Sequence, residues 1–515
     1  MQIEDDRRDP IILIAAAGRS ERMRGSDKLL RKIDGVPQLR RIALAAFATG
    51  CPVAVTLPPD CPSRHAALEG LEICLLTVTA CSEGISASLR TGAAFAEGRP
   101  MMLVLADMPD LSAQDLARMV ELHRRRPHDL LRASGAGGEG HPVLFPADLV
   151  AELHDLSGDI GARSIVTKHA DKLRSVPISG QNAVLDLDTP EDWATWEADQ
   201  ARSSGQFSAG AELVADPLKF LLATSGPAVI AVITGVEGTS YRSVGTLMVL
   251  LADRTVCGSL TNGCIEADLA MHAAEVFATG RPKHLRYGDG SPYFDIRLPC
   301  GGGIDIGLFP VSDRRVLEDA SYVLAGRNTI SVGFGSEGDM RLEPYRNSGW
   351  NGARFSVAFR PATRAIVFGD GLEAETLTRL MHAAGIQTKL ISAPLDPAGL
   401  ESPLTCRRPP GPDDILQAQL LADPWTAVVT LYHDHDKEID ILGEILRGPA
   451  FYVGAQGSKR VAQRRTEQLR MAGLDETHLA KLHAPAGLIP STRDPQSLAV
   501  SILADVIAAR LNLDR

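Results

Sequence analysis

Short apolar runs alternate with amphipathic stretches through the first 200 residues. Residues 11–17 and 101–106 are uninterrupted apolar runs, whereas 39–49 and 85–96 have the polar and apolar spacing of helices. Apolar runs of this length are typical of buried strands. Strands that alternate with helices in this way predict a parallel sheet covered by helices on both faces.

The pattern changes after residue 200. Residues 201–212 are small and polar and read as a linker, and the next region is rich in glycine and β-branched residues, with strands expected at 229–233 and 246–251. Near the end of the chain, a strand at 364–368, a helix at 372–384 and a strand at 388–391 form a βαβ opening. We therefore expect an α/β protein whose domains span 1–200, 213–345 and 346–515.

Composition restricts the class of function. The formal net charge is -11, and a nucleic-acid binder needs a basic surface, so we expect no nucleic-acid partner. No apolar run reaches the roughly 18 residues needed to cross a bilayer, and the charged first ten residues do not resemble a secretion signal. The eight cysteines form no C-x-x-C pair, so a disulfide framework is not expected. These features predict a cytoplasmic protein without a membrane partner.

Candidate phosphate chemistry follows the first strand. The segment A-A-A-G-R-S-E-R-M (15–23) places a glycine turn at the end of that strand, where backbone N–H groups can approach a phosphate. Arg22 and Lys28 can offset the charge of a triphosphate, and Asp107 ends another strand, where a carboxylate can hold Mg²⁺. Asp186 and Asp188 offer further carboxylates. Taken singly, the glycine reads as an ordinary turn and the aspartates as helix caps; together they indicate nucleotidyl transfer.

These residues resemble the MobA/MocA group of nucleotidyltransferases. The resemblance also covers G-I-S-A-S-L-R-T-G (84–92), L-A-D-M-P (105–109), G-H-P-V-L-F (140–145), G-D-I-G-A-R (158–163) and D-L-D-T-P-E-D (186–192). It implies a Rossmann-like nucleotidyltransferase domain of the branch that joins CMP from CTP to molybdopterin. It further implies nucleotide contacts from Ala16, Ala17, Gly18, Ser20, Arg22 and Lys28, Mg²⁺ ligands from Asp107, Asp188 and Asp186, and a pterin side formed by Ser88, His141 and Asp159.

Two cysteines lie in glycine-rich loops farther along the chain. Cys264 and Glu266 belong to T-N-G-C-I-E (261–266), and Cys300, Gly301 and Gly302 belong to L-P-C-G-G-G (298–303). Thiolates in such loops can ligate a soft metal or carry sulfur. The alternative, about equally weighted, is that each thiol is a small buried hydrophobic group. We predict that the two cysteines face one cofactor pocket.

The last region contains a dinucleotide-type turn and a polar run. Gly369, Gly371 and Ala374 form G-x-G-x-x-A after a strand, but the second strand ends in Ser392 where an acidic ribose ligand is expected. Ordinary NAD binding is therefore not indicated. The run His433, Asp434, His435 and Asp436 offers a metal site or simply a polar loop.

Taken in this order, with Y-V-G-A-Q-G-S-K-R (452–460) and H-A-P-A-G-L (483–488), the motifs resemble the XdhC/CoxI family. The resemblance implies a small α+β domain and a C-terminal Rossmann-like domain. It also implies binding of molybdenum cofactor and its delivery to a hydroxylase of the xanthine dehydrogenase type, with a sulfur donor as a second partner.

The sequence thus favours an Mg²⁺-dependent enzyme that transfers CMP from CTP to molybdopterin and passes the cofactor on. Three alternatives stay open. The protein is a cofactor chaperone without transferase activity, a transferase that uses another NTP or a sugar phosphate, or a nicotinamide-dependent oxidoreductase.

Overall fold

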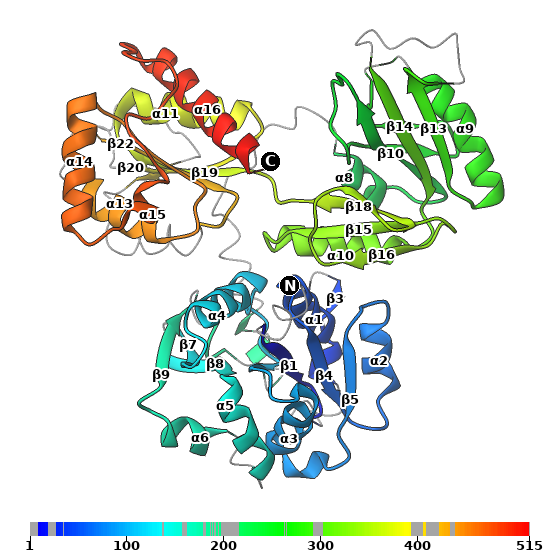
Figure 1. Cartoon of the computed structure of the whole chain (residues 1–515), viewed down its shortest axis with the longest axis vertical. Coiled ribbons are helices and arrows are strands. Elements are labelled where there is room, and N and C mark those ends of the chain that lie inside the picture. The colour runs from blue at the N-terminus through cyan, green and yellow to red at the C-terminus, as the bar shows by residue number, and fades with distance from the viewer. Residues whose placement is uncertain are drawn as a thin grey trace. The chain divides into compact units, whose positions relative to one another are not determined.

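The computed structural model shows an α/β protein (Figure 1). It describes residues 9–18, 27–33, 35–135, 138–156, 162–178, 182–185, 187, 189, 192, 193, 195, 196, 216–261, 263, 265–291, 302–392, 405–407, 422–432 and 438–513. These fall into two compact units, one formed by residues 1–197 with 215–360 and the other by 198–214 with 361–515. The linker expected at 201–212 lies outside the described residues. Within the described part of the chain, no helix has the length and apolar character that crossing a bilayer requires.

The first domain is built on a seven-stranded sheet of order β5-β4-β1-β6-β8-β7-β9. Strands β1, β4, β5 and β6 are parallel, and β8 pairs antiparallel with both β6 and β7. The strands are β1 (Ile11–Ala15), β4 (Val53–Leu57), β5 (Cys74–Thr77), β6 (Met101–Leu105), β7 (Leu130–Gly135), β8 (Gly138–Phe145) and β9 (Leu173–Pro177). A small hairpin, β2 (Lys32–Ile33) and β3 (Val36–Pro37), precedes the first long helix.

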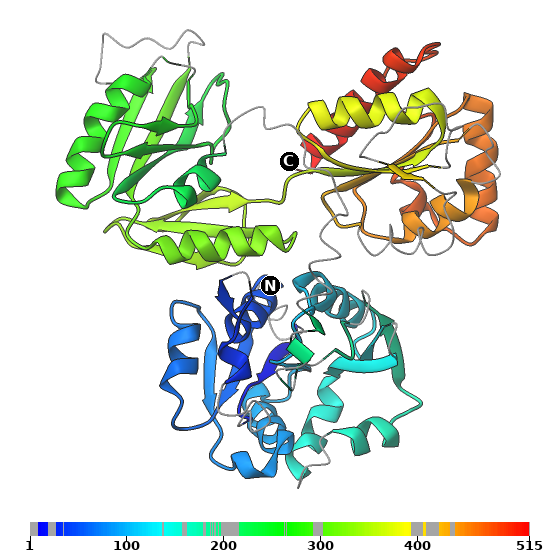
Figure 2. The same ribbon diagram turned by 180° about the vertical axis from the view of Figure 1, so that it is seen from behind.

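Helices cover both faces of this sheet, as the sequence predicts (Figure 2). Apolar residues of α1, α2 and α4 pack on one face, and those of α3, α5 and α6 on the other. The helices are α1 (Gln38–Phe47), α2 (Pro62–Leu68), α3 (Ile85–Ala96), α4 (Ala113–Arg125), α5 (Ala147–Val150) and α6 (Arg163–Lys168), with short 3₁₀ helices η2 (Lys28–Leu30), η3 (Cys81–Glu83) and η4 (Ala151–Asp155).

The second domain combines two antiparallel sheets. A five-stranded sheet has the order β12-β11-β10-β14-β13, and a four-stranded sheet has the order β16-β15-β18-β17. The elements are α8 (Pro217–Ala223), β10 (Ala228–Glu237), β11 (Leu247–Leu251), β12 (Val256–Cys257), α9 (Glu266–Thr279), β13 (Lys283–Gly288), β14 (Gly303–Pro310), α10 (Arg314–Ala325), β15 (Ile330–Gly335), β16 (Met340–Glu343), β17 (Gly349–Asn351) and β18 (Arg354–Phe359).

The second domain extends farther than the sequence pattern suggests. We expect its end at residue 345, before the turn signals of 347–363. In the structure the first turn signal leads into β17 and the second lies between β17 and β18, and both strands belong to the sheet that holds β15. The chain accordingly divides after Arg360, because β17 and β18 complete a sheet that began before the turns.

The second unit is a six-stranded, all-parallel sheet of order β21-β20-β19-β22-β23-β24. Numbered from its own first strand, this is 3-2-1-4-5-6, the Rossmann order. Helices α11 and α16 cover one face, and α13, α14 and α15 the other (Figure 2). The elements are β19 (Arg364–Gly369), α11 (Gly371–Ala383), β20 (Gln387–Ser392), β21 (Thr405–Arg407), β22 (Thr426–Leu431), α13 (Glu438–Arg447), β23 (Tyr452–Ala455), α14 (Lys459–Met471), α15 (Glu476–Leu479), β24 (Leu482–His483) and α16 (Pro495–Asn512).

Candidate active site

The carboxyl ends of β1 and β6 lie next to each other in the first sheet. Ala15 at the end of β1 pairs with Leu105 at the end of β6. From β1 the chain moves outward to β4 and β5, and then returns to β6 on the other side. Ligands of open parallel sheets bind at such a reversal of strand order, outside the carboxyl ends of the strands. The position alone therefore marks this edge as the candidate active site.

Lys28 and Asp107 meet at this edge. Lys28 is the first residue of η2, and its Nζ donates to Asp107 Oδ2 at 2.5 Å. Both side chains are mostly buried, with 15% and 20% of their surfaces exposed. The structure thus brings together two residues that the sequence predicts as partners in phosphate chemistry, although 79 positions separate them.

The backbone around Asp107 is held in place from two sides. The fully buried Gln38, at the start of α1, donates through Nε2 to Ala106 O and Met108 O, each at 3.1 Å. On another side, Leu187 N–H donates to Asp107 O at 3.4 Å. Leu187 stands between Asp186 and Asp188, which lie outside the described residues.

The Asp107 carboxylate suits a metal ion. Its Oδ1 is buried and has no hydrogen-bond partner among the described residues. A buried carboxylate oxygen without a hydrogen-bond donor lowers the stability of the fold unless a cation or a ligand group binds it. Mg²⁺ prefers carboxylate and phosphate oxygens, so this oxygen fits the metal that the sequence implies.

His141 lies close enough to Asp107 for the charge of Asp107 to affect its pKa. Burial and, to a smaller extent, the positive charge of Arg132 lower the pKa of His141 to about 4, although the negative charge of Asp107 opposes this shift. Its Nδ1 is buried and without a partner among the described residues. A neutral imidazole at the edge of the site can accept or donate a hydrogen bond without adding charge.

The start of the glycine turn is described, and its middle is not. Ala16 and Ala17 are buried directly after β1, and Gly18 follows. Ser20 and Arg22, predicted to contact the nucleotide, lie outside the described residues, as does Asp159 on the predicted pterin side.

Ser88 lies beneath this turn, and its hydroxyl is not presented to solvent. Thr56 Oγ1 on β4 accepts a hydrogen bond from Ala16 N–H and donates to Ser88 Oγ at 3.1 Å. Ser88 is only 3% exposed. The Ser88 hydroxyl is thus bonded to the residue that also binds Ala16, and its predicted contact with the pterin stays a prediction.

The cysteine loops of the second domain are partly described. Cys264, Cys300 and Gly301 lie outside the described residues, so the predicted cysteine pocket stays a prediction. Gly302 is needed for close packing, since a Cβ there would stand 2.5 Å from Thr239 O and 2.6 Å from Glu237 O.

Glu266 is occupied by its own loop. Its carboxylate accepts hydrogen bonds from the backbone N–H groups of Leu260, Thr261, Gly263 and Ile265 and from the hydroxyls of Ser259 and Thr261. Burial raises its pKa, but these donors outweigh burial and hold the pKa at about 2. Both oxygens of Glu266 are thus bonded to described residues of the segment before α9, and the cofactor contact expected of Glu266 stays a prediction.

The dinucleotide-type turn has the predicted context. Gly369 ends β19, where a Cβ would stand 2.7 Å from Leu431 O, and Gly371 starts α11 with φ +81°. Ala374 is buried where α11 packs on the sheet. Ser392 ends β20 as expected. His433, Asp434, His435 and Asp436 lie outside the described residues, and the described residues contain no cluster of His, Cys, Asp or Glu that could hold a metal ion.

Gln38, Thr56 and Arg64 were not singled out by the sequence. All three are buried polar residues that bond to the backbone around the predicted site. Thr56 is a polar residue within an apolar stretch, and Gln38 and Arg64 lie in mixed segments, so none of the three has a sequence signal that identifies a role.

Three family models match the chain in succession. They are the MobA-like NTP transferase domain over residues 12–173, the XdhC and CoxI family over 221–288, and the XdhC Rossmann domain over 365–506.

Similar proteins cover a little more than half of the chain. A molybdenum cofactor insertion chaperone, PaoD, of Escherichia coli (strain K12) is 32% identical over 287 residues, which cover 55% of this chain and 84% of that protein. A protein of Bacillus subtilis (strain 168) described as a probable xanthine dehydrogenase subunit is 25% identical and covers 57% and 96%. A crystal structure of a xanthine dehydrogenase from Bacillus halodurans aligns with 25% identity and a TM-score of 0.45, covering 57% of this chain and 95% of that one.

Proposed function

Because the chain belongs to the XdhC and CoxI family and carries a MobA-like NTP transferase domain before it, we propose that it acts in molybdenum cofactor maturation. In this proposal the first domain transfers CMP from CTP to the phosphate of molybdopterin, with Mg²⁺ as cofactor. The remaining domains hold the product and deliver it to a hydroxylase of the xanthine dehydrogenase type, with a sulfur donor as a further partner.

The observation that carries the transferase proposal is the Lys28–Asp107 pair at the carboxyl ends of β1 and β6. Phosphoryl transfer requires positioning and charge neutralisation more than covalent chemistry from the protein. A cation and a carboxylate with one unpartnered oxygen, placed at the reversal of strand order, supply the starting set for that chemistry.

In the proposed reaction, a phosphate oxygen of molybdopterin attacks the α-phosphorus of CTP. One P–O bond forms to the pterin phosphate, the bond to the β-phosphate breaks, and pyrophosphate leaves. Mg²⁺, held by Asp107 together with Asp188 or Asp186, would neutralise phosphate charge when bound. Lys28 binds the triphosphate and offsets the charge that develops on the leaving group. Gly18 and its neighbours let the backbone approach the phosphates.

His141 and Gln38 have supporting roles in this proposal. The neutral imidazole of His141 contributes a hydrogen bond on the pterin side without competing with Lys28 for phosphate charge. Gln38 holds the carbonyl groups of the residues before and after Asp107, so that the carboxylate keeps one direction.

The carrier role rests on the relatives and on the two glycine-rich cysteine loops. One relative is named as an insertion chaperone, and the XdhC and CoxI family model covers residues 221–288, which include the first of these loops. We propose that Cys264 and Cys300 hold the molybdenum–sulfur part of the cofactor, since soft thiolates suit that chemistry.

The decisive experiment is incubation of the full chain with molybdopterin, Mg²⁺ and each of CTP, GTP, ATP and UTP in turn, followed by mass analysis. We expect a cytosine dinucleotide product and pyrophosphate with CTP. A product with another base would change the substrate assignment. Absence of any product, together with retention of intact cofactor on a desalting column, would replace the transferase by a chaperone without transfer activity.

A further inference from the structure

The buried arginine Arg64 connects both ends of the glycine-turn segment. It lies on α2, outside the sequence motifs that indicate nucleotidyl transfer. Its Nη1 donates to Ala16 O at 2.6 Å and to Gly18 O at 2.8 Å, directly after β1. Its Nε and Nη2 donate to Asp27 Oδ2 and Oδ1 at 2.7 and 3.0 Å, directly before η2. One side chain therefore ties together two points of the chain on either side of residues 19–26.

The surroundings of Arg64 distinguish it from a phosphate ligand. It is only 4% exposed, and a buried guanidinium requires a paired charge and hydrogen-bond acceptors. The Asp27 carboxylate supplies the opposite charge, and the two carbonyl groups occupy both hydrogens of Nη1. These four donations are directed to the protein itself and not outward to a ligand.

Asp27 connects Arg64 to the proposed catalytic pair, Lys28 and Asp107. Asp27 is the N-cap of η2, where its Oδ1 accepts a hydrogen bond from Leu29 N–H at 3.1 Å. Lys28 is the first residue of that helix, and its Nζ contacts Asp107. A fork-shaped guanidinium can fix two carboxylate oxygens and two carbonyls at once, which a lysine ammonium cannot reproduce.

We propose that Arg64 is a positioning residue for nucleotidyl transfer, which sets the separation of Gly18 and Asp27 and thereby the placement of Lys28. This inference rests on the proposed function. Reacting groups must be held close to their working geometry, and a displacement of about 1 Å can lower a rate about 100-fold.

The test compares three variants of the full chain. Arg64→Lys keeps the positive charge and loses the planar guanidinium that binds several acceptors at once. Asp27→Asn keeps an N-cap oxygen and loses the ion pair. Arg124→Lys is the matched control, because Arg124 also binds an aspartate through two nitrogens, Nε to Asp9 Oδ1 at 2.9 Å and Nη2 to Oδ2 at 3.1 Å, before the opposite end of β1.

We expect Arg64→Lys to lower kcat/KM for transfer about 10- to 100-fold, with a fall in kcat and a rise in KM for the nucleotide. Asp27→Asn should change both constants in the same directions, and Arg124→Lys should change neither. If Arg64→Lys lowers only the melting temperature and keeps both constants, Arg64 is a core residue and the proposal is wrong.

A second measurement does not depend on turnover. Hydrogen exchange at the amides of 16–18 and 28–30 should be faster in Arg64→Lys and Asp27→Asn than in the wild type, and unchanged in Arg124→Lys. If the wild type transfers no nucleotide, the proposed function fails, and the exchange data alone then decide whether Arg64 holds this segment. Wild-type exchange in Arg64→Lys would overturn the proposal.

Discussion

Two residues from distant parts of the chain share the candidate active site, and each restrains the other. Lys28 occupies one oxygen of Asp107, and the second oxygen is buried without a partner among the described residues. Removal of Lys28 therefore leaves a mostly buried carboxylate without its cation, while removal of Asp107 leaves the ammonium without its anion. A comparison of the kinetics of a variant without Lys28 and a variant without Asp107 separates metal binding from charge stabilisation.

We predict that Asp107→Ala lowers the transfer rate about a thousandfold or more, because a metal ligand contributes several kcal/mol to the stabilisation of transition-state charge. Lys28→Ala should lower kcat more than it raises KM, since its charge is most useful as pyrophosphate departs. Steady-state kinetics over a range of Mg²⁺ concentrations measures both effects. Near-wild-type turnover of Asp107→Ala would remove this residue from the site.

The second residue-level prediction concerns His141. Burial places its pKa at about 4, below the ordinary value of 6.5. The unfolded chain therefore binds a proton at this side chain at a higher pH than the folded chain does. The stability that the neutral form contributes is present above pH 6.5 and is lost as the pH falls from 6.5 toward 4.

An NMR titration of the His141 ring should give a midpoint near pH 4. Asp107→Asn should move that midpoint lower, because the Asp107 charge favours the protonated imidazole. An unperturbed histidine titrates between about pH 6 and 7. If the transfer rate decreases in this pH range, the same decrease should occur in His141→Asn. A ring that titrates near 6.5 would show that the imidazole is solvated and not buried.

At the level of elements, the start of α9 shows how one carboxylate organises a whole loop. Glu266 stands in the first turn of α9, and its oxygens accept hydrogen bonds from N–H and O–H groups of residues 259–261, 263 and 265. Negative charge in the first turn is also favoured by the helix dipole. The loop that carries Cys264 is thereby anchored to the helix that follows it.

We predict that Glu266→Gln lowers stability by about 1–2 kcal/mol at neutral pH, allowing for partial solvent screening. The pKa of Glu266 is lowered from 4.5 to about 2, so its stabilising effect is present above pH 4.5 and is lost as the pH falls toward 2. Melting curves of wild type and variant should therefore converge as the pH falls below 4.5. Glu275→Gln, a change to an exposed residue of the same helix, should stay within about 0.5 kcal/mol. A constant difference at every pH would contradict this role.

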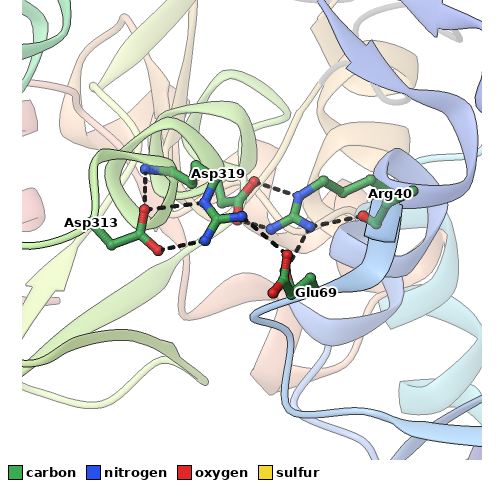
Figure 3. Close-up of polar contacts among 6 residues, drawn as sticks. Arg40, Glu69, Asp313 and Asp319 are labelled. Carbon is green, nitrogen blue, oxygen red and sulfur yellow. Dashed lines mark hydrogen bonds and ion pairs between the residues drawn. The ribbon is translucent and has the colours of Figure 1, made fainter. Parts of the chain in front are cut away.

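At the level of the whole molecule, the first unit contains two domains that share contacts. Arg40 on α1 binds the Asp319 carboxylate of α10 through Nε and Nη2, and also donates to Ala67 O and Glu69 O (Figure 3). Arg41 Nε donates to Tyr322 OH at 2.7 Å. Around this pair, apolar residues of α1, α4, α8 and α10 belong to one hydrophobic cluster. Helix α1 therefore contacts the candidate active-site edge through Gln38 and α10 through Arg40.

We predict that residues 1–360 unfold as one cooperative unit, and that Asp319→Ala destabilises this unit by about 2–4 kcal/mol, because it leaves a mostly buried guanidinium without its anion. Calorimetry of a 1–360 chain measures both. Asp339→Ala is the control, since it removes an exposed partner of Arg354. Two separate transitions in the wild-type 1–360 chain would show that the linker at 201–212 joins independent modules, as its composition suggests.

The sequence by itself determined several of the elements and the need for glycine at two of the turns. Apolar runs and helical spacing placed β1, β6, α3 and β19 within one or two residues of their observed bounds, because burial of an apolar face depends mainly on local periodicity. The motif around Gly369 and Gly371 indicated a strand–turn–helix unit, since only glycine tolerates that backbone approach and that positive φ.

Tertiary structure alone decided which polar groups meet. The separation of Lys28 from Asp107 in the chain carries no information about their 2.5 Å contact, which arises because β1 and β6 become neighbours in the sheet. The same holds for three buried polar side chains, Arg64, Gln38 and Thr56. Buried polar groups are hydrogen-bonded, and the fold decides which groups are their partners. The end of the second domain has a similar cause, because β18 pairs with β15 and β17 pairs with β18, and the pairing of β15 with β18 joins strands that are not adjacent in the chain.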